Sequence, residues 1–348
     1  MKAFVITRYK GPLREADVAE PVVGDDDVLV QVHAAGLNQL DERIRLGEFK
    51  QILPYKLPLI LGNDLAGTVI NVGTRVRGFK PGDEVYARPD KSRIGTFAER
   101  IAVAEGDLAL KPASISMTEA GSLPLVALTA WQALVERGKV ERGQKVLIHA
   151  GAGGVGSIAI QLARHLGASV ATTASASNAD FVRSLGADTV IDYRAENFEQ
   201  ILDGHDFVLD SLGGKNLEKS LRILKPGGKA VGIAGPPDPA FAREAGVNPL
   251  LRLAIRGISW KIRQQAKKRG VTYEFLFMRA SGDQLRLISA LVDDGKLRPI
   301  VGKVFDFTQT PQALQSLAKG GIRGKAVVTL ADFPPPSTHR TTNPDAEV

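Results

Sequence analysis

Short apolar runs separated by glycine and proline dominate the first 122 residues of the chain. The opening segment, MKAFVITRYK, alternates apolar and polar positions, which is typical of a strand with one buried face. Runs of this kind, bounded by glycine and proline turns, predict short β-strands. We expect strands at residues 2–8, 28–34 and 67–72, and a further one after the turn at residues 81–83. The first third of the chain therefore predicts a mostly-β domain.

The pattern changes near Pro124, where apolar positions begin to recur at helical spacing. Strand-like runs then alternate with helical or glycine-containing stretches, at residues 145–150, 169–173, 189–192, 207–210, 229–233 and 273–277. Strands that alternate with helices predict βαβ units and a doubly wound parallel sheet, which binds a nucleotide across the carboxyl ends of its strands. The expected fold class is therefore α/β, with a parallel dinucleotide-binding sheet and a second, mostly-β domain.

The order of the segments predicts that the mostly-β domain is interrupted by the parallel sheet. A helix at 284–293 and strands at 301–305 and 325–330 are expected to rejoin the first domain. The predicted parts are a substrate domain (1–122 and 282–331), a dinucleotide-binding domain (123–281) with a basic helical insert (236–270), and a disordered tail (332–348).

A glycine motif lies directly between the first predicted parallel strand and the helix that follows it. After the strand at residues 145–150 the chain reads Gly151-x-Gly153-x-x-Gly156 and continues as an apolar helix. The three glycines allow a tight turn, close approach of the backbone to a pyrophosphate, and tight packing of helix on strand. The free N–H groups near Gly154 and Val155 then face the phosphates at the positive end of the helix dipole.

The turn after the second strand predicts which nucleotide binds. An NAD site normally places a carboxylate there to hold the ribose 2′-hydroxyl. This chain instead offers Ser175, Ser177 and Asn178, which can donate hydrogen bonds to a 2′-phosphate and do not repel it. The turn itself has no lysine or arginine, so Arg194 or Arg323 would have to supply positive charge from elsewhere. We expect NADPH as the cofactor.

Composition excludes several other kinds of chemistry. The 348-residue chain has no cysteine, so it has no disulfide, thiolate metal site or cysteine nucleophile. Its five histidines show no metal-ligand spacing, and no metal is expected. No secretory signal or membrane-spanning run is evident, so a cytoplasmic location is expected. The net charge of +7 does not accompany any nucleic-acid-binding module, and we predict no nucleic-acid partner.

Several motifs, in order, resemble one enzyme family over nearly the whole chain up to about Leu330. They are GLNQLD (36–41), LGNDLAG (61–67), FKPGDEV (79–85), GTFAE (95–99), LPLVALTA (123–130), the glycine motif, LGAD (185–188) and LKPGG (224–228). This set resembles the zinc-free quinone oxidoreductase branch of the medium-chain dehydrogenase/reductase superfamily. The resemblance implies a substrate domain similar to chaperonin-10 and an active-site cleft between the two domains. It also implies that Asn38 and Asn63 stand where zinc-dependent relatives carry a cysteine and a histidine ligand.

The resemblance implies roles for Asn38 and Asp41 near the nicotinamide. Asn38 would donate to a substrate oxygen, and Asp41 would orient it or relay a proton. Both residue types are also ordinary helix caps, and this interpretation remains open. Phe49 falls where several relatives have an active-site tyrosine, and Tyr55 is a possible substitute or a packing aromatic.

Further cofactor contacts are expected where the resemblance and the strand ends coincide. The expected residues are Thr129 near the nicotinamide ribose, Tyr193 near the 2′-phosphate, Ser211, Ala234 and Gly235 at strand ends, and Arg323 near the C-terminus. Arg323 and Lys325 have an alternative interpretation as solvated surface charges.

Without a metal to polarise a carbonyl group, hydride must go to an acceptor whose product anion is delocalised. A quinone or an α,β-unsaturated carbonyl compound meets that requirement, and either is the expected small-molecule partner. The alternative is an NADPH-binding adaptor or redox sensor without turnover. By analogy with the family, a homodimer is expected through the edge strand at residues 273–277, whose exposed apolar edge would otherwise favour aggregation.

Residues 248–269 form an unusual basic stretch without any acidic residue. Leu251, Ile255, Ile258 and Ile262 are spaced to share one face of a single helix. The favoured interpretation is a helix that packs on its own domain with a solvated basic face. A membrane-surface helix, a site for an acidic partner, and a lid over a long substrate remain open.

Overall fold

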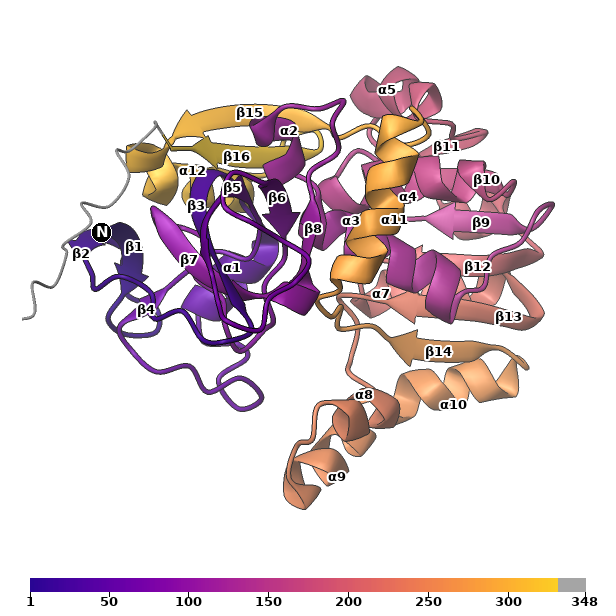
Figure 1. Ribbon diagram of the computed structural model, residues 1–348. Helices are drawn as coiled ribbons and strands as arrows, with labels where there is room; N and C mark the ends of the chain where they lie inside the picture. Colours follow the sequence, from indigo (N-terminus) through magenta and orange to yellow (C-terminus); the bar gives the residue numbers. More distant parts are fainter. Residues whose placement is uncertain (331–348) are drawn as a thin grey trace, which may run out of the picture.

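The computed structural model describes residues 1–330, and the predicted tail at 332–348 lies outside the described residues. Two sheets stand side by side, with the N-terminal half of the chain around one and the middle of the chain around the other (Figure 1). The expected fold class is confirmed: a parallel dinucleotide-binding sheet is joined to a mixed β domain.

The middle of the chain forms a six-stranded parallel sheet in the order β11-β10-β9-β12-β13-β14. Its strands are β9 (Lys145–Ile148), β10 (Ser169–Ala174), β11 (Thr189–Asp192), β12 (His205–Asp210), β13 (Leu224–Gly232) and β14 (Thr272–Phe275). The chain leaves β9 toward β10 on one side and later returns to β12 on the other side. The carboxyl ends of β9 and β12 therefore border the crevice where a ligand binds in folds of this kind.

Helices connect these strands. They are α4 (Gly154–His165), η3 (Ala176–Asn178), α5 (Ala179–Ser184), α6 (Phe198–Ile201), α7 (Gly214–Ile223), α8 (Pro239–Glu244), α9 (Pro249–Ile258) and α10 (Trp260–Lys268). Helix α4 has a strongly apolar inner face, with Ile158, Ile160 and Leu162 buried in the central core. Burial of that face against the sheet fixes the glycine motif at the sheet's carboxyl edge.

The first domain contains a seven-stranded sheet and a small three-stranded sheet. The large sheet comprises β3 (Asp27–Gly36), β5 (Leu65–Val72), β6 (Glu84–Ala87), β7 (Arg100–Ala104), β8 (Leu108–Leu110), β15 (Val301–Asp306) and β16 (Lys325–Thr329). The small one comprises β1 (Lys2–Ile6), β2 (Arg14–Asp17) and β4 (Leu59–Ile60). Strand β16 pairs antiparallel with β3, so the C-terminal part of the chain returns to the N-terminal sheet.

The remaining elements lie around or between the two sheets. They are α1 (Gln39–Arg45), η1 (Glu105–Asp107), α2 (Met117–Gly121), α3 (Pro124–Trp131), the π-helical η2 (Gln132–Arg137), α11 (Gly282–Asp293), η4 (Phe307–Gln309) and α12 (Thr310–Lys319). One buried cluster contains residues of both domains, among them Tyr86 and Val146. The Tyr86 hydroxyl also donates to the Leu285 carbonyl of α11 at 2.6 Å. The two domains therefore pack through a shared core.

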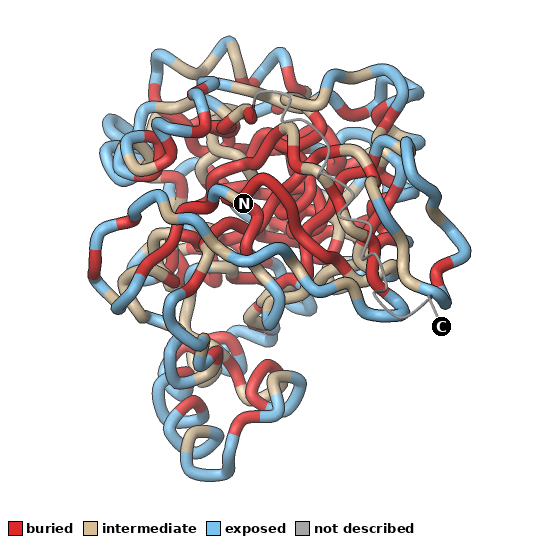
Figure 2. The backbone as a smooth tube through the Cα atoms, turned by 60° about the vertical axis from the view of Figure 1, so that its left-hand side comes forward, coloured by how far each residue is buried: buried red, intermediate tan, exposed pale blue. Residues whose placement is uncertain are grey.

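Two predicted elements differ from the structure. Strand β14 ends at Phe275, so Leu276 and Phe277 lie beyond the end of the strand. The single helix expected over residues 248–269 is two helices, α9 and α10, with Ser259 between them. The Ser259 hydroxyl donates to the Ile255 carbonyl and accepts from the Arg263 side chain, contacts that accompany bending in helices. Helices α8 and α9 protrude from the body of the molecule as a separate lobe (Figures 1 and 2).

Candidate active site

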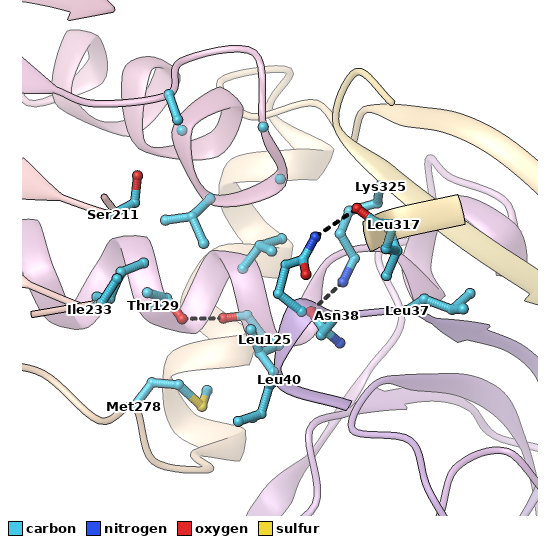
Figure 3. A pocket seen from close by; sticks show the side chains of 18 of the residues that line it. Leu37, Asn38, Leu40, Leu125, Thr129, Ser211, Ile233, Met278, Leu317 and Lys325 are labelled. Atoms are coloured by element: carbon cyan, nitrogen blue, oxygen red, sulfur yellow. Dashed lines mark hydrogen bonds between the residues drawn. The ribbon is translucent and has the colours of Figure 1, made fainter. Parts of the chain in front are cut away.

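A cavity of about 380 Å³ lies between the two domains at the carboxyl edge of the parallel sheet (Figure 3). This volume is within the range of small-molecule and cofactor sites. Its walls are mostly apolar, with contributions from Leu37, Leu40, Phe49, Leu125, Val126, Ile233, Phe275, Leu276, Phe277, Met278, Leu317 and Ile322. Asn38, Arg43, Arg88, Thr129, Ser211 and Lys325 add polar groups to the same walls. In a cleft of this kind the polar groups orient a ligand, and the apolar walls exclude bulk water.

The glycine motif has the geometry that a pyrophosphate requires. Helix α4 begins at Gly154, and its N-cap Gly153 has an extended backbone and no side chain to cap the free N–H groups. A Cβ at Gly151 would lie 2.2 Å from Thr172 Oγ1, and one at Gly156 would lie 2.3 Å from the Ala150 carbonyl. Gly151 and Gly156 therefore allow close packing, while Gly153 to Gly156 line the cavity. These residues fit a dinucleotide.

The C-terminal loop before β16 closes over the glycine motif. The Gly324 N–H donates to the Ala152 carbonyl at 2.9 Å, and Gly153 pairs with Gly324 in a single β-bridge. Gly320, Gly321 and Gly324, with φ values of 71°, 88° and 67°, adopt the left-handed conformation that glycine tolerates best. This loop holds the two domains together beside the cofactor cradle.

The turn after β10 brings the three predicted phosphate contacts together. Ser175 Oγ lies 3.0 Å from Ser177 Oγ, and Asn178 Nδ2 donates to Ser175 Oγ at 3.1 Å. The Arg323 guanidinium donates to Asn178 Oδ1 at 2.6 Å and to the Ser177 carbonyl at 2.9 Å. Arg323 therefore places a positive charge at the turn that lacks one of its own. The turn does not line the cavity, which is the separation expected between the two ends of a dinucleotide.

Tyr193 lies next to this turn at the end of β11. Its N–H donates to the Ala174 carbonyl at 3.3 Å, and its ring is largely exposed. The Arg194 guanidinium is 5.6 Å from the centre of that ring. An aromatic face and a second positive charge therefore lie near the turn.

Asn38, Asp64 and Lys325 form a buried polar cluster at the cavity wall. Lys325 Nζ donates to Asn38 Oδ1 at 2.5 Å (Figure 3) and to Asp64 Oδ2 at 2.9 Å. Asn38 Nδ2 in turn donates to Asp64 Oδ2 and to the Gly36 carbonyl. Asp64 Oδ1 accepts the backbone N–H of Leu125, near the start of α3. Both amide protons of Asn38 are therefore engaged within the chain, and Asn38 holds Lys325 rather than pointing a free donor at the substrate.

Asp41 lies behind this cluster, fully buried, and does not line the cavity. Its carboxylate accepts from the Asn38 N–H at 2.7 Å and from Asn63 Nδ2 at 2.7 Å. Burial raises the pKa of Asp41 to about 7, against the opposing effects of these hydrogen bonds and of the nearby Lys325 charge. Asp41 acts on the site through Asn38 and the start of α1.

The other predicted cofactor residues divide into two groups. Thr129, Ser211 and Ala234 line the cavity, although the Thr129 hydroxyl also donates to the Leu125 carbonyl at 2.7 Å in its own helix. Gly235 does not line it. A Cβ there would lie 2.4 Å from the Tyr273 hydroxyl, so Gly235 makes room for that ring.

Phe49 lines the cavity, while Tyr55 does not take the place of the missing tyrosine. The Tyr55 hydroxyl donates to the Lys91 carbonyl at 2.6 Å and is turned away from the cavity lining. Phe49 packs edge-on against Phe277, with ring centres 5.7 Å apart, and so closes one side of the cleft with an apolar wall.

Sequence reasoning missed or undervalued several residues of the site. Lys325 is 5% exposed, so its interpretation as a solvated surface charge is wrong. The signal that could have indicated burial is its position at the start of a mostly apolar strand, KAVVTL. Arg88, 1% exposed, also lines the cavity, and its Nε has no hydrogen-bond partner among the described residues. The cavity wall formed by Phe275 to Met278 was not predicted, because the sequence of this apolar run is typical of a longer strand.

Comparisons with known proteins agree with this architecture. A family model described as an alcohol dehydrogenase GroES-like domain matches residues 24–113, and one described as a zinc-binding dehydrogenase matches residues 185–328. The chain is 37% identical to the mitochondrial NAD(P)H oxidoreductase RTN4IP1 of Danio rerio, with 95% of this chain and 92% of that protein aligned.

Two further similarities are of comparable extent. The chain is 36% identical to the chloroplastic NADPH-dependent alkenal/one oxidoreductase of Arabidopsis thaliana, covering 94% of this chain and 79% of that protein. It superposes on the structure of the quinone oxidoreductase from Coxiella burnetii with a TM-score of 0.83 and 32% identity, covering 95% of this chain and 99% of that one.

Proposed function

The chain belongs to the medium-chain dehydrogenase/reductase superfamily, in its zinc-independent branch, and we propose that it reduces a quinone or an α,β-unsaturated carbonyl compound with NADPH. The activity is that of an oxidoreductase. The choice of acceptor rests on the residues of the cleft and on the substrate classes in the names of two similar proteins, an alkenal/one oxidoreductase and a quinone oxidoreductase.

One observation carries the proposal. The apolar cavity is lined both by the glycine cradle and by the buried Lys325, whose Cδ would lie 3.0 Å from a Cβ at Gly154. The cradle would hold the pyrophosphate of NADPH so that its nicotinamide reaches the cavity, where the bound cofactor would supply hydride. When hydride adds to a conjugated carbon of the acceptor, negative charge develops on the acceptor oxygen. The ammonium group of Lys325 can donate a hydrogen bond to that oxygen and stabilise the charge. Two of its three protons are used by Asn38 and Asp64, which leaves one for such an oxygen.

The chain's own residues contribute mainly positioning and electrostatic stabilisation. Lys325 is held in place by Asn38 and Asp64, so little reorganisation is needed when charge develops beside it. Arg88 is a second buried cation that forms no salt bridge within residues 1–330, and burial lowers its pKa. The apolar walls exclude water and strengthen both electrostatic effects. Reduction of the acceptor is completed by one proton, which is taken up from solvent at the oxygen that contacts Lys325.

The cofactor preference follows from the turn after β10. Ser175, Ser177 and Arg323 supply donors and positive charge where a carboxylate would otherwise reject a 2′-phosphate. We propose that these residues bind the 2′-phosphate of NADPH together with Asn178 and Tyr193.

The silent adaptor is the competing hypothesis. The cavity argues against it because an adaptor that only binds nucleotide has no use for an apolar chamber beyond the nicotinamide end. The two hypotheses differ in turnover. NADPH and NADH oxidation should be followed against a panel of quinones, enones and simple aldehydes. We expect NADPH-dependent turnover of quinones or enones and none of simple aldehydes; stoichiometric NADPH binding without turnover on the whole panel favours the adaptor.

A further inference from the structure

The lobe formed by α8 and α9 carries apolar side chains on two opposite faces. On the inner face, Leu251 and Ile255 pack with Ala242 and Val247 of the same lobe and with Ile52 of the first domain. The phenylalanine of α8, Phe241, packs on Phe275 and Phe277, with ring centres 5.1 and 5.8 Å apart. The lobe is therefore anchored to the outside of the wall that closes the substrate cavity.

The outer face of α9 has no partner among the described residues. Leu250, Leu253, Ala254, Gly257 and Ile258 are all exposed, and they recur at i, i+3, i+4, i+7 and i+8. This spacing places them on one continuous stripe of the helix. Leu250 is 81% exposed, Leu253 67% and Ile258 64%. The expectation that Ile258 shares one apolar face with Leu251 and Ile255 is therefore wrong. Ile258 belongs to the outer stripe, whereas Leu251 and Ile255 face the inner side.

The next helix adds an aromatic residue to this surface. Trp260, at the start of α10 and two residues after Ile258, is 59% exposed. In Figure 2 this lobe projects below the body of the molecule, and much of its tube has the colour of exposed residues. An isolated exposed leucine needs no explanation, but four large apolar side chains within eleven residues do.

The same segment is strongly basic. No acidic residue occurs between Glu244 and Glu274. Seven basic residues lie in this interval: Arg252, Arg256, Lys261, Arg263, Lys267, Lys268 and Arg269. Within residues 1–330, only Lys261 of these seven forms a salt bridge, with Glu218. Arg252 and Arg263 donate to backbone carbonyls, but no carboxylate neutralises the charges of the other six within residues 1–330.

We propose that the outer stripe of α9, with Trp260 and the basic residues of α9 and α10, docks on the surface of an anionic lipid bilayer. Exposed leucine, isoleucine and tryptophan beside lysine and arginine is the composition of a helix that lies in a membrane interface. Tryptophan settles at the headgroup level, and basic side chains bind anionic headgroups.

Lying on the bilayer is distinct from crossing it. Across residues 1–330, no helix is both long enough and apolar enough to span a membrane. A second copy of the chain fits the stripe less well, because a two-fold contact would bring two sets of like charges together. The lobe also packs on Phe275 and Phe277, which line the cavity, so docking brings the bilayer close to the wall of the substrate chamber.

Fluorescence provides a direct test, because the chain has two tryptophans. In a Trp131→Phe background, Trp260 is the only reporter. The full chain should be titrated with phosphatidylcholine vesicles and with vesicles that contain 30% phosphatidylglycerol. We expect a blue shift of Trp260 emission and co-flotation with the anionic vesicles only, and both should be lost in high salt.

Two variants separate the apolar and the basic contributions. Leu250→Ser with Leu253→Ser removes the stripe, and its control is Val22→Ser with Leu287→Ser, which are also exposed. Arg256→Gln, Lys267→Gln and Lys268→Gln together remove three charges, and the matched control is Arg14→Gln, Arg142→Gln and Lys296→Gln. Each basic residue near an anionic surface adds roughly fivefold to the affinity, so the triple variant should bind about a hundredfold more weakly.

The controls should bind anionic vesicles as the parent chain does. The proposal is overturned if the parent binds neither kind of vesicle, or if the control variants lose as much affinity as the lobe variants. It is also overturned if the apolar variant abolishes self-association while vesicle binding is absent, because a second copy would then be the occupant of the stripe.

Discussion

Lys325 brings a positive charge into the cavity wall from a strand that is otherwise apolar. Its ammonium group is fixed by Asn38 and Asp64, which lie 287 and 261 residues away in the sequence. A buried charge that is paired and hydrogen-bonded can be retained at modest cost, whereas an unpaired one is strongly destabilising. The cluster of Asn38, Asp64 and Lys325 therefore contributes both to the folding stability of the chain and to the proposed reaction. Variants can separate these two contributions.

Replacing Lys325 by methionine should lower kcat at least a hundredfold, since removal of one preorganised donor to a developing oxyanion typically costs ~2.7–4 kcal/mol. It should also lower the thermal midpoint, because Asp64 is left as an unpaired buried carboxylate. Steady-state kinetics and thermal unfolding measure the two effects.

The double variant Lys325→Met with Asp64→Asn is the control for folding. The asparagine removes the unpaired charge and keeps an acceptor for the Leu125 N–H. We expect the thermal midpoint to recover and kcat to stay low. A double variant with the parent's kcat would exclude Lys325 from the chemistry.

Asp41 gives a pH dependence of stability whose sign follows from burial. Its folded pKa of about 7 is above the ordinary value of 3.8. Between these two values the folded chain keeps a proton that the unfolded chain has released. The free energy of unfolding should therefore fall as pH rises from about 4 to about 7, by up to about 1.4 kcal/mol per pH unit from this residue.

Asp41→Asn should remove this contribution. Chemical unfolding of the parent and the variant at pH 5 and pH 8 isolates it, because all other titrating groups are shared. Relative to the parent, we expect the free energy of unfolding of the variant to be larger at pH 8 than at pH 5. An equal difference at the two pH values would mean that Asp41 is already ionised in the folded chain at pH 5.

At the residue scale, the sequence located Asn38 and Asp41 but not their contacts. For each of these two residues, the spacing was compatible with a helix cap and with a catalytic role. The structure places Asp41 at the N-terminus of α1 and behind the cavity wall. The direction of the Asn38 amide depends on Lys325 and Asp64, which no local pattern connects to it. Residue types could be predicted; a network assembled from distant segments could not.

At the element scale, periodicity predicted the strands and helices well where one physical requirement dominated. The glycine motif has a strand before it and an amphipathic helix after it, and all three were located closely. The predictions failed where two requirements competed. The run Tyr273 to Phe277 looked like a strand throughout, but its last part leaves the sheet to line the cavity. The basic segment has two apolar faces, and spacing alone favoured only one of them.

The turn between β10 and α5 gives a prediction at this scale. Ser175→Asp would place a carboxylate beside the 2′-phosphate, in a turn whose Ser177 and Asn178 side chains both bond to Ser175. Charge-assisted hydrogen bonds contribute roughly 1.5–3 kcal/mol each, so loss of one such bond should weaken NADPH binding by about ten- to a hundred-and-fiftyfold. NADH binding should be unchanged or improved.

Dissociation constants for the two cofactors, measured by fluorescence or calorimetry, decide this point. Ser184→Asp, on the exposed surface of α5, is the matched control for added charge and should leave both constants unchanged. Equal losses for NADPH and NADH in Ser175→Asp would place the phosphate elsewhere.

At the scale of the whole molecule, the two-sheet architecture followed from the order of elements along the chain. Alternating strands and helices predicted the parallel sheet, and the later strands add to the first sheet through β16 and β3. The arrangement of the cavity was beyond the sequence, because it depends on how the loop before β16 meets the glycine motif across the two domains. The lobe of α8 and α9 was likewise seen only as a basic insert, without its orientation.

The outer edge of strand β14 is a possible site for pairing between two copies of the chain. Strand β14 pairs with β13 on one side and stands at the end of the strand order. The Leu276 N–H bonds toward β13, so alternation turns the Tyr273 and Phe275 N–H groups to the outer edge. The Phe275 N–H is already bonded to Asp238 Oδ2 at 3.1 Å, which leaves Tyr273 as the centre of any pairing.

We predict a two-fold dimer in which the two β14 strands pair around Tyr273. An unpaired strand edge is a site for association, and closed pairing with a second copy removes that hazard. Sedimentation velocity at micromolar concentration should give a dimer, and hydrogen exchange of the Tyr273 amide should slow as the protein concentration rises across the dissociation constant. The Phe275 amide is the internal control, since its bond to Asp238 is made within one chain and its exchange should respond less to concentration. A monomer at ten micromolar, or a dimer in which the Tyr273 amide exchanges at the same rate at all concentrations, would contradict pairing through this edge.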